Sequence, residues 1–359
     1  MDEAQKVDLK KAPQSVYGLN IEEAEALARQ MNQPAYRGRQ MLEWLYKHHL
    51  TDLTLAKTLP ADFRQGLAGA YTAQSIELVE ANRSSNGEST KFLYRTRDER
   101  LLETVLISQR GRETVCVSTQ LGCKMGCVFC ASGKGKFGRN LTPGEIVEQV
   151  AGVARKTGKR VSNIVFMGMG EPLDNFEATM KSLDILQAPW GFGIGARRIT
   201  VSTSGITPKM IEFVKRHEGR VRLSVSLHSS NDKTRTELMP INKRYNLPEL
   251  VKTLTEINRT LKREITFEFT LIHGINDSRE EAEGLASISK PLAAKVNLIP
   301  YNPISEMDFK TPSKQNVEAF QAILESYGLR VTVRQTAGRD INAACGQLRL
   351  DREKEKPAA

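Results

Sequence analysis

The sequence predicts an α/β fold in which six strand-and-helix units form a partial barrel or an open doubly wound sheet. From Thr114 onward, short runs of apolar and β-branched residues alternate with amphipathic segments, as in parallel strands joined by crossover helices. Six such units are too few for a complete eight-stranded barrel. The chain of 359 residues is long enough for this core and a smaller attached unit.

The smaller unit precedes the alternating pattern. Residues 1–75 are predicted to be mainly helical, with amphipathic segments at Ile21–Gln30 and Gly38–His49 and a break at Pro60. Strand-like pieces follow, joined by the turn-rich stretch NRSSNGEST. We predict an accessory domain over residues 1–96 and a core domain over residues 97–348, which includes the last cysteine. A flexible polar tail follows at residues 349–359.

The elements of the core follow one another regularly. The strand-like runs are TVCVST, NIVFMG, RITVST, RLSVSL, ITFEFTL and KVNLIP. The helix-like segments lie between them, at residues 143–157, 176–187, 207–217, 248–262 and 279–289. A polar motif follows every strand, from Cys123–Cys130 after the first to His273 after the fifth and Asn302 after the sixth. Because functional loops of α/β folds gather at the carboxyl ends of the strands, we expect these motifs on one rim.

The charge of the chain suggests a polyanionic partner. The formal charge is +10, and residues 124–160 carry eight basic and two acidic side chains, a local charge of +6. A positive field beside the cysteines favours a phosphate-bearing substrate such as nucleic acid. The alternative is a basic protein whose charge serves only solubility.

The cysteine count and the apolar segments indicate a compartment. Residues 1–20 lack the apolar core of a signal peptide, and no apolar run reaches the roughly 20 residues that cross a bilayer. The five cysteines are an odd number, which argues against a secreted disulfide framework. We therefore expect a protein of the reducing cytoplasm, with no membrane partner.

Three of the cysteines, Cys123, Cys127 and Cys130, lie within eight residues of one another. A structural zinc site normally takes four protein ligands, usually from two separate pairs. Three thiolates on one loop instead suit three irons of a [4Fe–4S] cluster and leave the fourth iron open to a small molecule. The alternative is a chance grouping, since a free cysteine often serves as a small buried apolar side chain.

The spacing C-x3-C-x-aromatic-C, in which Phe129 is the aromatic residue, resembles the radical S-adenosylmethionine (SAM) superfamily. The resemblance implies a partial (β/α)6 barrel, a [4Fe–4S] cluster on the three cysteines, and SAM bound at the open iron and cleaved to a 5′-deoxyadenosyl radical. The segment MGMGEPLDN is similar to the superfamily's glycine-rich strand end, where Gly170 and Glu171 would contact the amine of SAM. Alone, such a loop is more often a simple turn.

Over roughly residues 15–350 the chain also resembles the RlmN/Cfr family of radical SAM RNA adenine methyltransferases. The matching motifs, in family order, are LLETVLI, VCVSTQLGCKMGCVFCASG, NIVFMGMGEPLDN, ITVSTSG, SVSLHSSND, YNP and RDINAACGQL. The resemblance implies methylation at C2 of an adenosine in the peptidyl-transferase region of 23S rRNA, and of the adenosine that follows the anticodon in tRNAs. Methylation at C8 is the alternative, because both branches of the family share the cysteine set.

The family resemblance assigns the two remaining cysteines, which would otherwise be expected to be buried packing residues. Cys345 would accept a methyl group from a first SAM, and the radical from a second SAM would take a hydrogen atom from that group. The resulting carbon radical would add to the adenine. Cys116 would then attack Cys345 to release the product, which leaves a disulfide, and Glu103 would accept the ring proton.

Further positions and partners follow from the same resemblance. The implied SAM-binding residues are Gly170, Glu171, Ser202, Ser226, Leu227, His228 and Asn302. The resemblance also implies that the N-terminal unit grips structured RNA, that a flavodoxin-like protein supplies single electrons, and that the protein is a monomer. His228 has an alternative role as a satisfied structural imidazole.

Two other classes of protein share parts of the pattern. A different radical enzyme, such as a glycyl-radical activase or a sulfur-inserting enzyme, would not need Cys116 and Cys345. A non-catalytic RNA-binding protein with a structural metal would hold zinc and would not cleave SAM. Arg197 and Arg198, before the third strand, are candidates for phosphate contacts, although such pairs usually lie on a solvated face.

Overall fold

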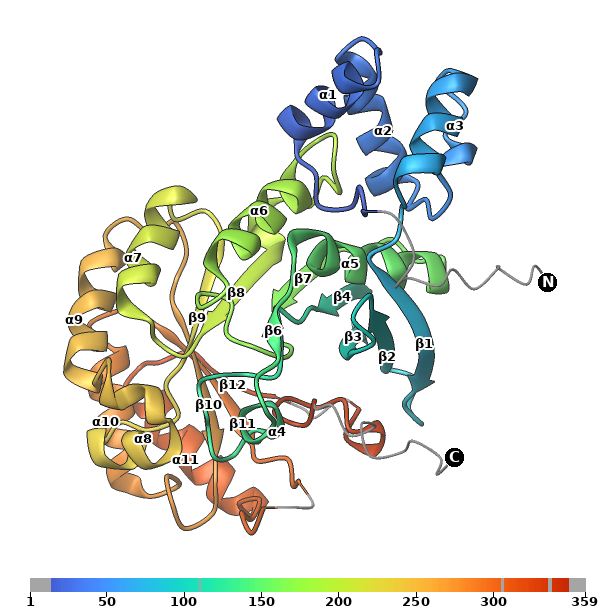
Figure 1. The fold of residues 1–359 in the computed structure, drawn as a ribbon. Helices are drawn as coiled ribbons and strands as arrows, with labels where there is room; N and C mark the ends of the chain where they lie inside the picture. Colours follow the sequence, from blue (N-terminus) through green and yellow to red (C-terminus); the bar gives the residue numbers. More distant parts are fainter. Residues whose placement is uncertain (1–13, 110, 305–306, 335–337, 349–359) are drawn as a thin grey trace.

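The computed structural model describes residues 14–109, 111–304, 307–334 and 338–348. The tail predicted at residues 349–359 lies outside the described residues. At the centre is a ten-stranded sheet with the order β1-β2-β3-β4-β7-β8-β9-β10-β11-β12 (Figure 1). Neighbouring strands from β1 to β4 run antiparallel, and those from β4 to β12 run parallel.

The six strands predicted for the core are all present in the parallel part of the sheet. They are β4 (Arg112–Cys116), β7 (Asn163–Phe166), β8 (Ile199–Thr203), β9 (Arg222–Ser226), β10 (Thr266–Leu271) and β11 (Lys295–Pro300). A seventh parallel strand, β12 (Val331–Val333), pairs with β11 and is not among the predicted elements. Its three residues are too few to show an alternating pattern.

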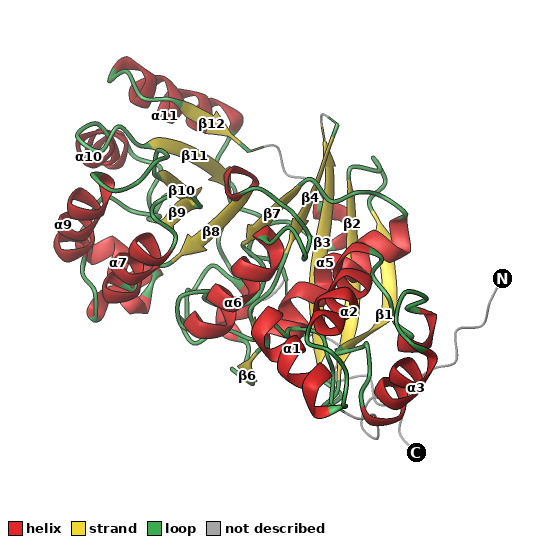
Figure 2. Cartoon of the chain, turned by 90° about the horizontal axis from the view of Figure 1, so that it is seen from above, coloured by secondary structure: helices red, strands yellow, loops and turns green. Residues whose placement is uncertain are grey.

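The order of the parallel strands distinguishes the two predicted architectures. Strands β4 and β7 to β12 lie side by side in sequence order. Right-handed crossovers between successive neighbours place all connecting helices on the same face, whereas a doubly wound sheet reverses its order at a switch point. Helices α7, α9, α10 and α11 accordingly lie along the outside of the curved sheet (Figure 2). The prediction of a partial barrel is confirmed.

All five predicted connecting helices are present. They are α5 (Pro143–Thr157), α6 (Phe176–Gln187), α7 (Thr207–Arg216), α9 (Leu247–Asn258) and α10 (Arg279–Ser289). Two further helices, α8 (Asp232–Leu238) and α11 (Lys314–Ser326), are not among the predicted elements. Short elements complete the described core: α4 (Ala131–Lys134), β5 (Gln120–Leu121), β6 (Arg139–Asn140) and 3-10 turns at Ala196–Arg198, Pro240–Lys243 and Arg339–Ile341.

The N-terminal unit is helical at first and then joins the sheet. Its helices are α1 (Ile21–Gln30), α2 (Tyr36–Lys47) and α3 (Ala61–Ala70), with a 3-10 turn at Leu53–Leu55. Strands β1 (Ile76–Arg83) and β2 (Ser89–Thr96) pair with each other, and β3 (Leu101–Gln109) connects them to β4. The sheet therefore runs without a break across residue 96, and the division into domains there stays a prediction.

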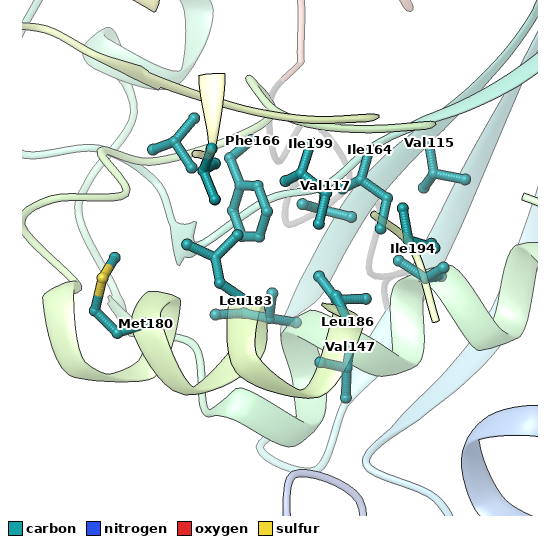
Figure 3. Close-up of a cluster of buried hydrophobic side chains, with 14 of the residues drawn as sticks. Val115, Val117, Val147, Ile164, Phe166, Met180, Leu183, Leu186, Ile194 and Ile199 are labelled. Atoms are coloured by element: carbon teal, nitrogen blue, oxygen red, sulfur yellow. The ribbon is translucent and has the colours of Figure 1, made fainter. Parts of the chain in front are cut away.

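One part of the hydrophobic core lies between the sheet and helices α5 and α6, and the same core continues under α7, α9, α10 and α11. Helix-facing residues of neighbouring strands, such as Val115, Ile164 and Ile199, are fully buried and pack toward Val147 and Leu186 (Figure 3). Such period-2 burial on the strands and helical spacing on α5 produced the alternating pattern of the sequence.

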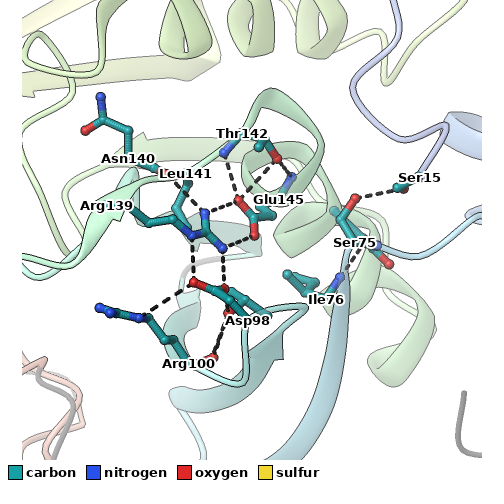
Figure 4. Close-up of polar contacts among 12 residues, drawn as sticks. Ser15, Ser75, Ile76, Asp98, Arg100, Arg139, Asn140, Leu141, Thr142 and Glu145 are labelled. Atoms are coloured by element: carbon teal, nitrogen blue, oxygen red, sulfur yellow. Dashed lines mark hydrogen bonds and ion pairs between the residues drawn. The ribbon is translucent and has the colours of Figure 1, made fainter. Parts of the chain in front are cut away.

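A polar cluster holds the start of α5 beside the returning end of the cysteine loop. Thr142 caps the helix and forms a capping box with Glu145. Arg139, on β6, bridges Glu145 at 2.7 Å and Asp98 at 2.6 Å (Figure 4). Because β6 pairs with β5, which precedes the cysteines, this ion-pair cluster fixes the base of the loop at residues 122–138.

Within the described residues, no helix has the length and apolar character to cross a membrane.

Candidate active site

A pocket lies at the carboxyl ends of the parallel strands, and most of the predicted site residues meet there. Ten of the thirteen line it: Cys123, Cys127, Cys130, Gly170, Glu171, Ser202, Ser226, His228, Asn302 and Cys345. The expectation that polar strand ends share one rim thus holds for most strands. After β10 it does not, because the His273 side chain is exposed and contacts Asp277 at 3.2 Å.

The three clustered cysteines present their thiols to this pocket. Burial raises the pKa of Cys123 to about 12 and the pKa of Cys127 well above the ordinary thiol value. A smaller contribution to the raised pKa of Cys127 is repulsion from Cys130 and Cys123, so the three thiols are electrostatic neighbours. Metal binding to such thiols must release their protons.

Glu171 joins the ends of two neighbouring strands. Its buried carboxylate accepts hydrogen bonds from the backbone N–H of Ser204, after β8, at 2.7 Å and of Leu173 at 3.0 Å. Burial raises the pKa of Glu171. These donors hold the carboxyl group at the wall of the pocket, on the loop that follows β7.

The glycines of this loop answer a packing requirement within the chain. A Cβ atom at Gly168 would lie 2.6 Å from Ser118 Oγ, and one at Gly170 would lie 2.5 Å from Gln120 Cβ. Gly170 also has a φ of +96°, which disfavours other residues. These glycines therefore let the loop pack closely against the segment that leads to the cysteines. A close approach to a cofactor stays a prediction.

His228 lies at the end of β9 with one ring nitrogen already occupied. Its Nδ1 accepts a hydrogen bond from the Thr270 N–H at 2.9 Å, and its ring meets Phe129 edge to face at 4.7 Å. Burial lowers the pKa of His228 to about 3, so the ring is neutral. A neutral ring that accepts at Nδ1 carries its proton on Nε2. The imidazole is thus structurally satisfied on one side and keeps a donor on the other.

Leu227, next to His228, behaves differently from the other predicted residues. Its side chain is fully buried in the main core and does not line the pocket. Its backbone N–H donates to the Glu268 carbonyl at 3.0 Å. Any contact of Leu227 with a ligand would have to come from the backbone.

Cys345 is held at the pocket from both sides. The Asn302 side-chain amide donates to the Cys345 carbonyl at 3.1 Å, and Nη1 of Arg334 lies 3.0 Å from Cys345 Sγ. The attraction of Cys345 is the leading reason why the pKa of Arg334 is raised. The guanidinium is therefore positioned to stabilise a thiolate at Cys345.

Cys116 and Cys345 line one small cavity of about 70 Å³. It adjoins the larger pocket, because Arg334, Cys130 and Cys345 line both. Both cysteines are free thiols, so the predicted disulfide is not formed in this structure. Burial, followed by repulsion from Cys345, raises the pKa of Cys116 to about 12, and Arg334 opposes that shift.

Glu103 lies on β3, buried, and lines neither cavity. Its carboxylate forms an ion pair with Lys91 at 3.0 Å. Val105, two residues along β3, pairs with Cys116, so Glu103 and Cys116 share one face of the sheet. The structure thus places Glu103 on the same face of the sheet as Cys116 but not at the wall of the pocket, and its role stays a prediction.

Comparison with known proteins covers almost the whole chain. A model of the radical SAM superfamily matches residues 117–286. The curated "Probable dual-specificity RNA methyltransferase RlmN" of Geobacillus kaustophilus is 41% identical over 346 residues, which are 95% of this chain and 94% of the relative. The protein of the same name from Pelotomaculum thermopropionicum is 42% identical over 336 residues, 93% of this chain and 91% of that relative. The chain belongs to the RlmN family.

A solved structure agrees with this assignment. A radical SAM methyltransferase from Sphaerobacter thermophilus superposes with a TM-score of 0.90 at 43% identity, and the match covers 94% of this chain and 100% of that one. The family resemblance drawn from the motifs is confirmed, and with it the radical SAM fold.

Several polar residues that line or support this RlmN-family pocket are absent from the predicted set. Arg235, on α8, is fully buried and donates to the carbonyls of Leu227 at 3.1 Å and Ser204 at 2.8 Å, which ties the ends of β8 and β9 together. Arg334 contacts Cys345 from the end of β12. Glu268, on β10, lines the pocket with its Oε2 buried and without a hydrogen-bond partner among the described residues. The spacing of charged residues gave no signal for these contacts.

The donor set of the pocket fits the groups that the family uses. Among the described residues, no group of three or more His, Cys, Asp or Glu side chains is arranged to hold a single metal ion. Each cysteine of a [4Fe–4S] cluster binds a different iron, so thiols for a cluster need not meet at one point. Glu268 Oε2 is a buried acceptor that a polar ligand such as SAM would satisfy. The individual ligands stay a prediction.

Proposed function

We propose that this protein methylates C2 of an adenosine in 23S rRNA and of the adenosine 3′ to the anticodon in tRNAs, using Cys345 as the methyl carrier. The main support is that Cys345 and Cys116 line one cavity next to the pocket of the clustered cysteines. The curated relatives are named as dual-specificity RNA methyltransferases, which supports RNA as the substrate.

Ten side chains and loops would hold the cofactors. Cys123, Cys127 and Cys130 would bind a [4Fe–4S] cluster; Gly170, Glu171, Ser202, Ser226, His228 and Asn302, with the backbone of Leu227, would bind SAM. When bound, these groups supply the methyl group and the one-electron chemistry that activates it. Glu171 is suited to an ammonium group because its carboxylate is oriented by two backbone donors.

Cys345 would act first as a nucleophile. Adenine C2 lies between two ring nitrogens and is too electron-poor to displace a methyl group from a sulfonium directly. A thiolate can do so. Arg334 would hold the Cys345 sulfur in the thiolate form through the 3.0 Å contact, and Asn302 would fix the backbone that carries it.

Cys116 would act last, when the RNA is joined to Cys345 through a methylene group. A base, for which we propose Glu103, takes the ring proton from C2 while the adduct gives up its one unpaired electron, for which the [4Fe–4S] cluster would be the acceptor. The Cys116 thiolate then forms a bond with the Cys345 sulfur, and the electron pair of the sulfur–carbon bond goes to the methylene carbon, which takes a proton to become methyl. The product is free, and a Cys116–Cys345 disulfide remains for a thiol reductant to open. Because burial raises the pKa of Cys116, this step depends on the nearby Arg334.

The surrounding roles are part of the same proposal. A flavodoxin-like protein would supply electrons, the chain would act as a monomer in the cytoplasm, and the domain at residues 1–96 would contact structured RNA while residues 97–348 carry the chemistry.

Nucleoside mass spectrometry tests this function. Anaerobically reconstituted protein would be incubated with a reductant, methyl-labelled SAM and either unmodified 23S rRNA fragments or tRNA. We expect the label in 2-methyladenosine from both RNAs. Label in 8-methyladenosine would instead assign the C8 reaction, and cleavage of SAM without labelled RNA would contradict the substrate.

A further inference from the structure

A second cavity, of about 650 Å³, lies at the opposite ends of the strands that carry the candidate active site. Its walls include the segments at residues 158–162, just before β7, and 191–198, just before β8, together with the end of α2. None of the residues that line it also lines the pocket of the cysteines. Strands β7 and β8 thus have one cavity at each end, and the function proposed above uses only one of them.

The lining of this amino-end cavity is strongly basic. Lys47, Lys159, Arg160 and Arg198 line it, and no Asp or Glu does. Lys159 is neutralised by Glu113 at 2.8 Å, and Lys47 is partly neutralised by Glu43 at 3.4 Å.

The two arginines differ from the lysines. Both are exposed, and neither forms an ion pair within the part of the chain that the structure describes. A guanidinium is planar and offers paired donors that match the oxygens of a phosphate group. Two unpaired guanidinium groups in one cavity therefore favour a phosphate-bearing ligand.

The charge is gathered here by folding. Three basic residues of the segment at residues 124–160 are held in ion pairs. Lys124 pairs with Asp174, and Arg155 pairs with Glu148. Arg139 pairs with both Asp98 and Glu145. These pairs neutralise much of the positive field that the sequence places beside the cysteines. Arg160, from the end of the segment, instead joins Arg198 at the far end of the strands.

An aromatic wall with an unsatisfied polar atom completes the cavity. The rings of His49 and Phe192 both line it and lie nearly parallel, 5.6 Å apart with an angle of 24°. Nδ1 of His49 is buried and has no hydrogen-bond partner among the described residues. Burial lowers the pKa of His49 to about 4, so this nitrogen belongs to a neutral ring and is able to bond to a polar ligand.

We propose that the amino-end cavity binds a phosphate group, with Arg160 and Arg198 as its main contacts and His49 as a further polar contact. Two sources share this chemistry, the backbone of an RNA and a free nucleotide. The RNA source rests on the function proposed above, whereas phosphate binding itself does not. An RNA held here would be anchored at a point far along the strands from the adenosine that reacts.

The chain carries its own reporters for a test. It has two tryptophans. Trp190 directly precedes the lining residue Gly191, and its ring lies 6.0 Å from that of the lining residue Tyr46. Trp44, on α2, contacts Thr58 and His48 instead. Neither lines the pocket of the cysteines. A change in the emission of Trp190 therefore reports on the amino-end cavity, and Trp44 contributes a background signal.

The experiment titrates the full-length protein with inorganic phosphate, with AMP and with a short unmodified RNA hairpin, by calorimetry and by tryptophan emission. The test variant is the double substitution Arg160→Glu with Arg198→Glu. A second variant, Gly195→Glu, adds a carboxylate where a Cβ atom meets nothing within 4 Å. The control is Lys252→Glu with Arg259→Glu, which changes the charge equally at two exposed positions, one on α9 and one at its C-cap. Thermal unfolding checks that each variant is folded.

We expect at least one probe to bind and to change the emission, with affinity at least about tenfold lower in the double variant and reduced by Gly195→Glu, because two charge-assisted contacts are lost. The control should stay within about twofold of the wild type. Binding of phosphate and AMP would assign a free nucleotide, and binding of the hairpin alone would assign RNA. The proposal is overturned if no probe binds, or if the control loses as much affinity as the double variant. Arginine-dependent binding without RNA methylation would count against the proposed function and leave this site standing.

Discussion

The two ends of strands β7 and β8 differ in how their charged groups are satisfied. At the carboxyl ends, Glu171 accepts two backbone hydrogen bonds and Arg334 contacts Cys345. At the amino ends, Arg160 and Arg198 line a cavity without an ion-pair partner among the described residues. Paired and partly buried charges fix geometry, whereas exposed unpaired charges are available to a ligand. The same two strands therefore separate a site suited to chemistry from a site suited to binding.

The largest effect is expected at the carboxyl ends. Replacing Cys345 with alanine removes the proposed methyl carrier, so we expect no detectable methylated RNA. The variant should still bind SAM, and phosphate binding at the amino-end cavity should be unchanged, because no residue is shared between the two. Liquid scintillation of labelled RNA measures the first outcome and calorimetry the others. Methylated RNA within about tenfold of the wild-type level would show that Cys345 carries nothing.

A smaller effect is expected for Arg334. Its contact with Cys345 is a charge-assisted hydrogen bond, worth about 1.5–3 kcal/mol, so Arg334→Gln should slow methylation of Cys345 by about 10- to 100-fold. Arg334→Lys, which keeps the positive charge, should restore part of the rate. Peptide mass spectrometry of the Cys345 methyl group provides the measurement.

The control for Arg334 is Arg330→Gln. Arg330 lies just before β12, with 63% of its side chain exposed and paired with Glu264. Its loss should leave the rate of Cys345 methylation unchanged. If both variants slowed methylation of Cys345 equally, the effect of Arg334 would come from the overall charge and not from its contact with Cys345.

The smallest effect concerns stability and compares His228 at the carboxyl ends with His49 at the amino ends, two histidines whose pKa is lowered by burial. The pKa of His228 is about 3 in the folded protein and 6.5 in a free side chain, so the unfolded state binds more protons at pH 5. Stability should therefore fall by about 2 kcal/mol between pH 6.5 and pH 5 on account of this residue. Chemical denaturation of the cofactor-free protein at both pH values measures it, and His228→Gln should remove this part of the slope.

His49 shifts in the same direction at the amino ends but is less buried, so His49→Gln should flatten the slope less. If His49→Gln flattened the dependence of stability on pH more than His228→Gln does, the expected order of the two histidines would be contradicted.

The fold was largely predictable because its strands carry local patterns. The six runs from TVCVST to KVNLIP alternate apolar residues at the spacing of a strand. The three residues of β12 carry no such signal, and β3 was known only as the family motif LLETVLI. Sequence order alone left the barrel and the open sheet undecided, because pairing between strands is a property of the folded chain.

The candidate site was predictable only in part. Residues at or just after the carboxyl end of a strand, such as Ser202 and Asn302, reach the pocket because parallel strands end on one edge. The contacts of Arg235 and Arg334 could not be predicted in this way, because their partners Ser204 and Cys345 are distant in sequence and each arginine looks like an ordinary surface residue in its own segment. The basic segment near the cysteines predicted a stronger positive field than the structure has there. Acidic partners from other elements, such as Asp174, neutralise part of its charge.

The most direct test of the central claim, that the methyl group reaches RNA through Cys345, uses the Cys116→Ala variant. Cys116 lies in the same small cavity as Cys345, and without its thiol the methylene bridge to RNA has no resolving partner. After reaction with RNA and SAM, a denaturing gel followed by peptide mass spectrometry should reveal RNA bound covalently to Cys345. Absence of an adduct, or an adduct on another residue, would contradict the account.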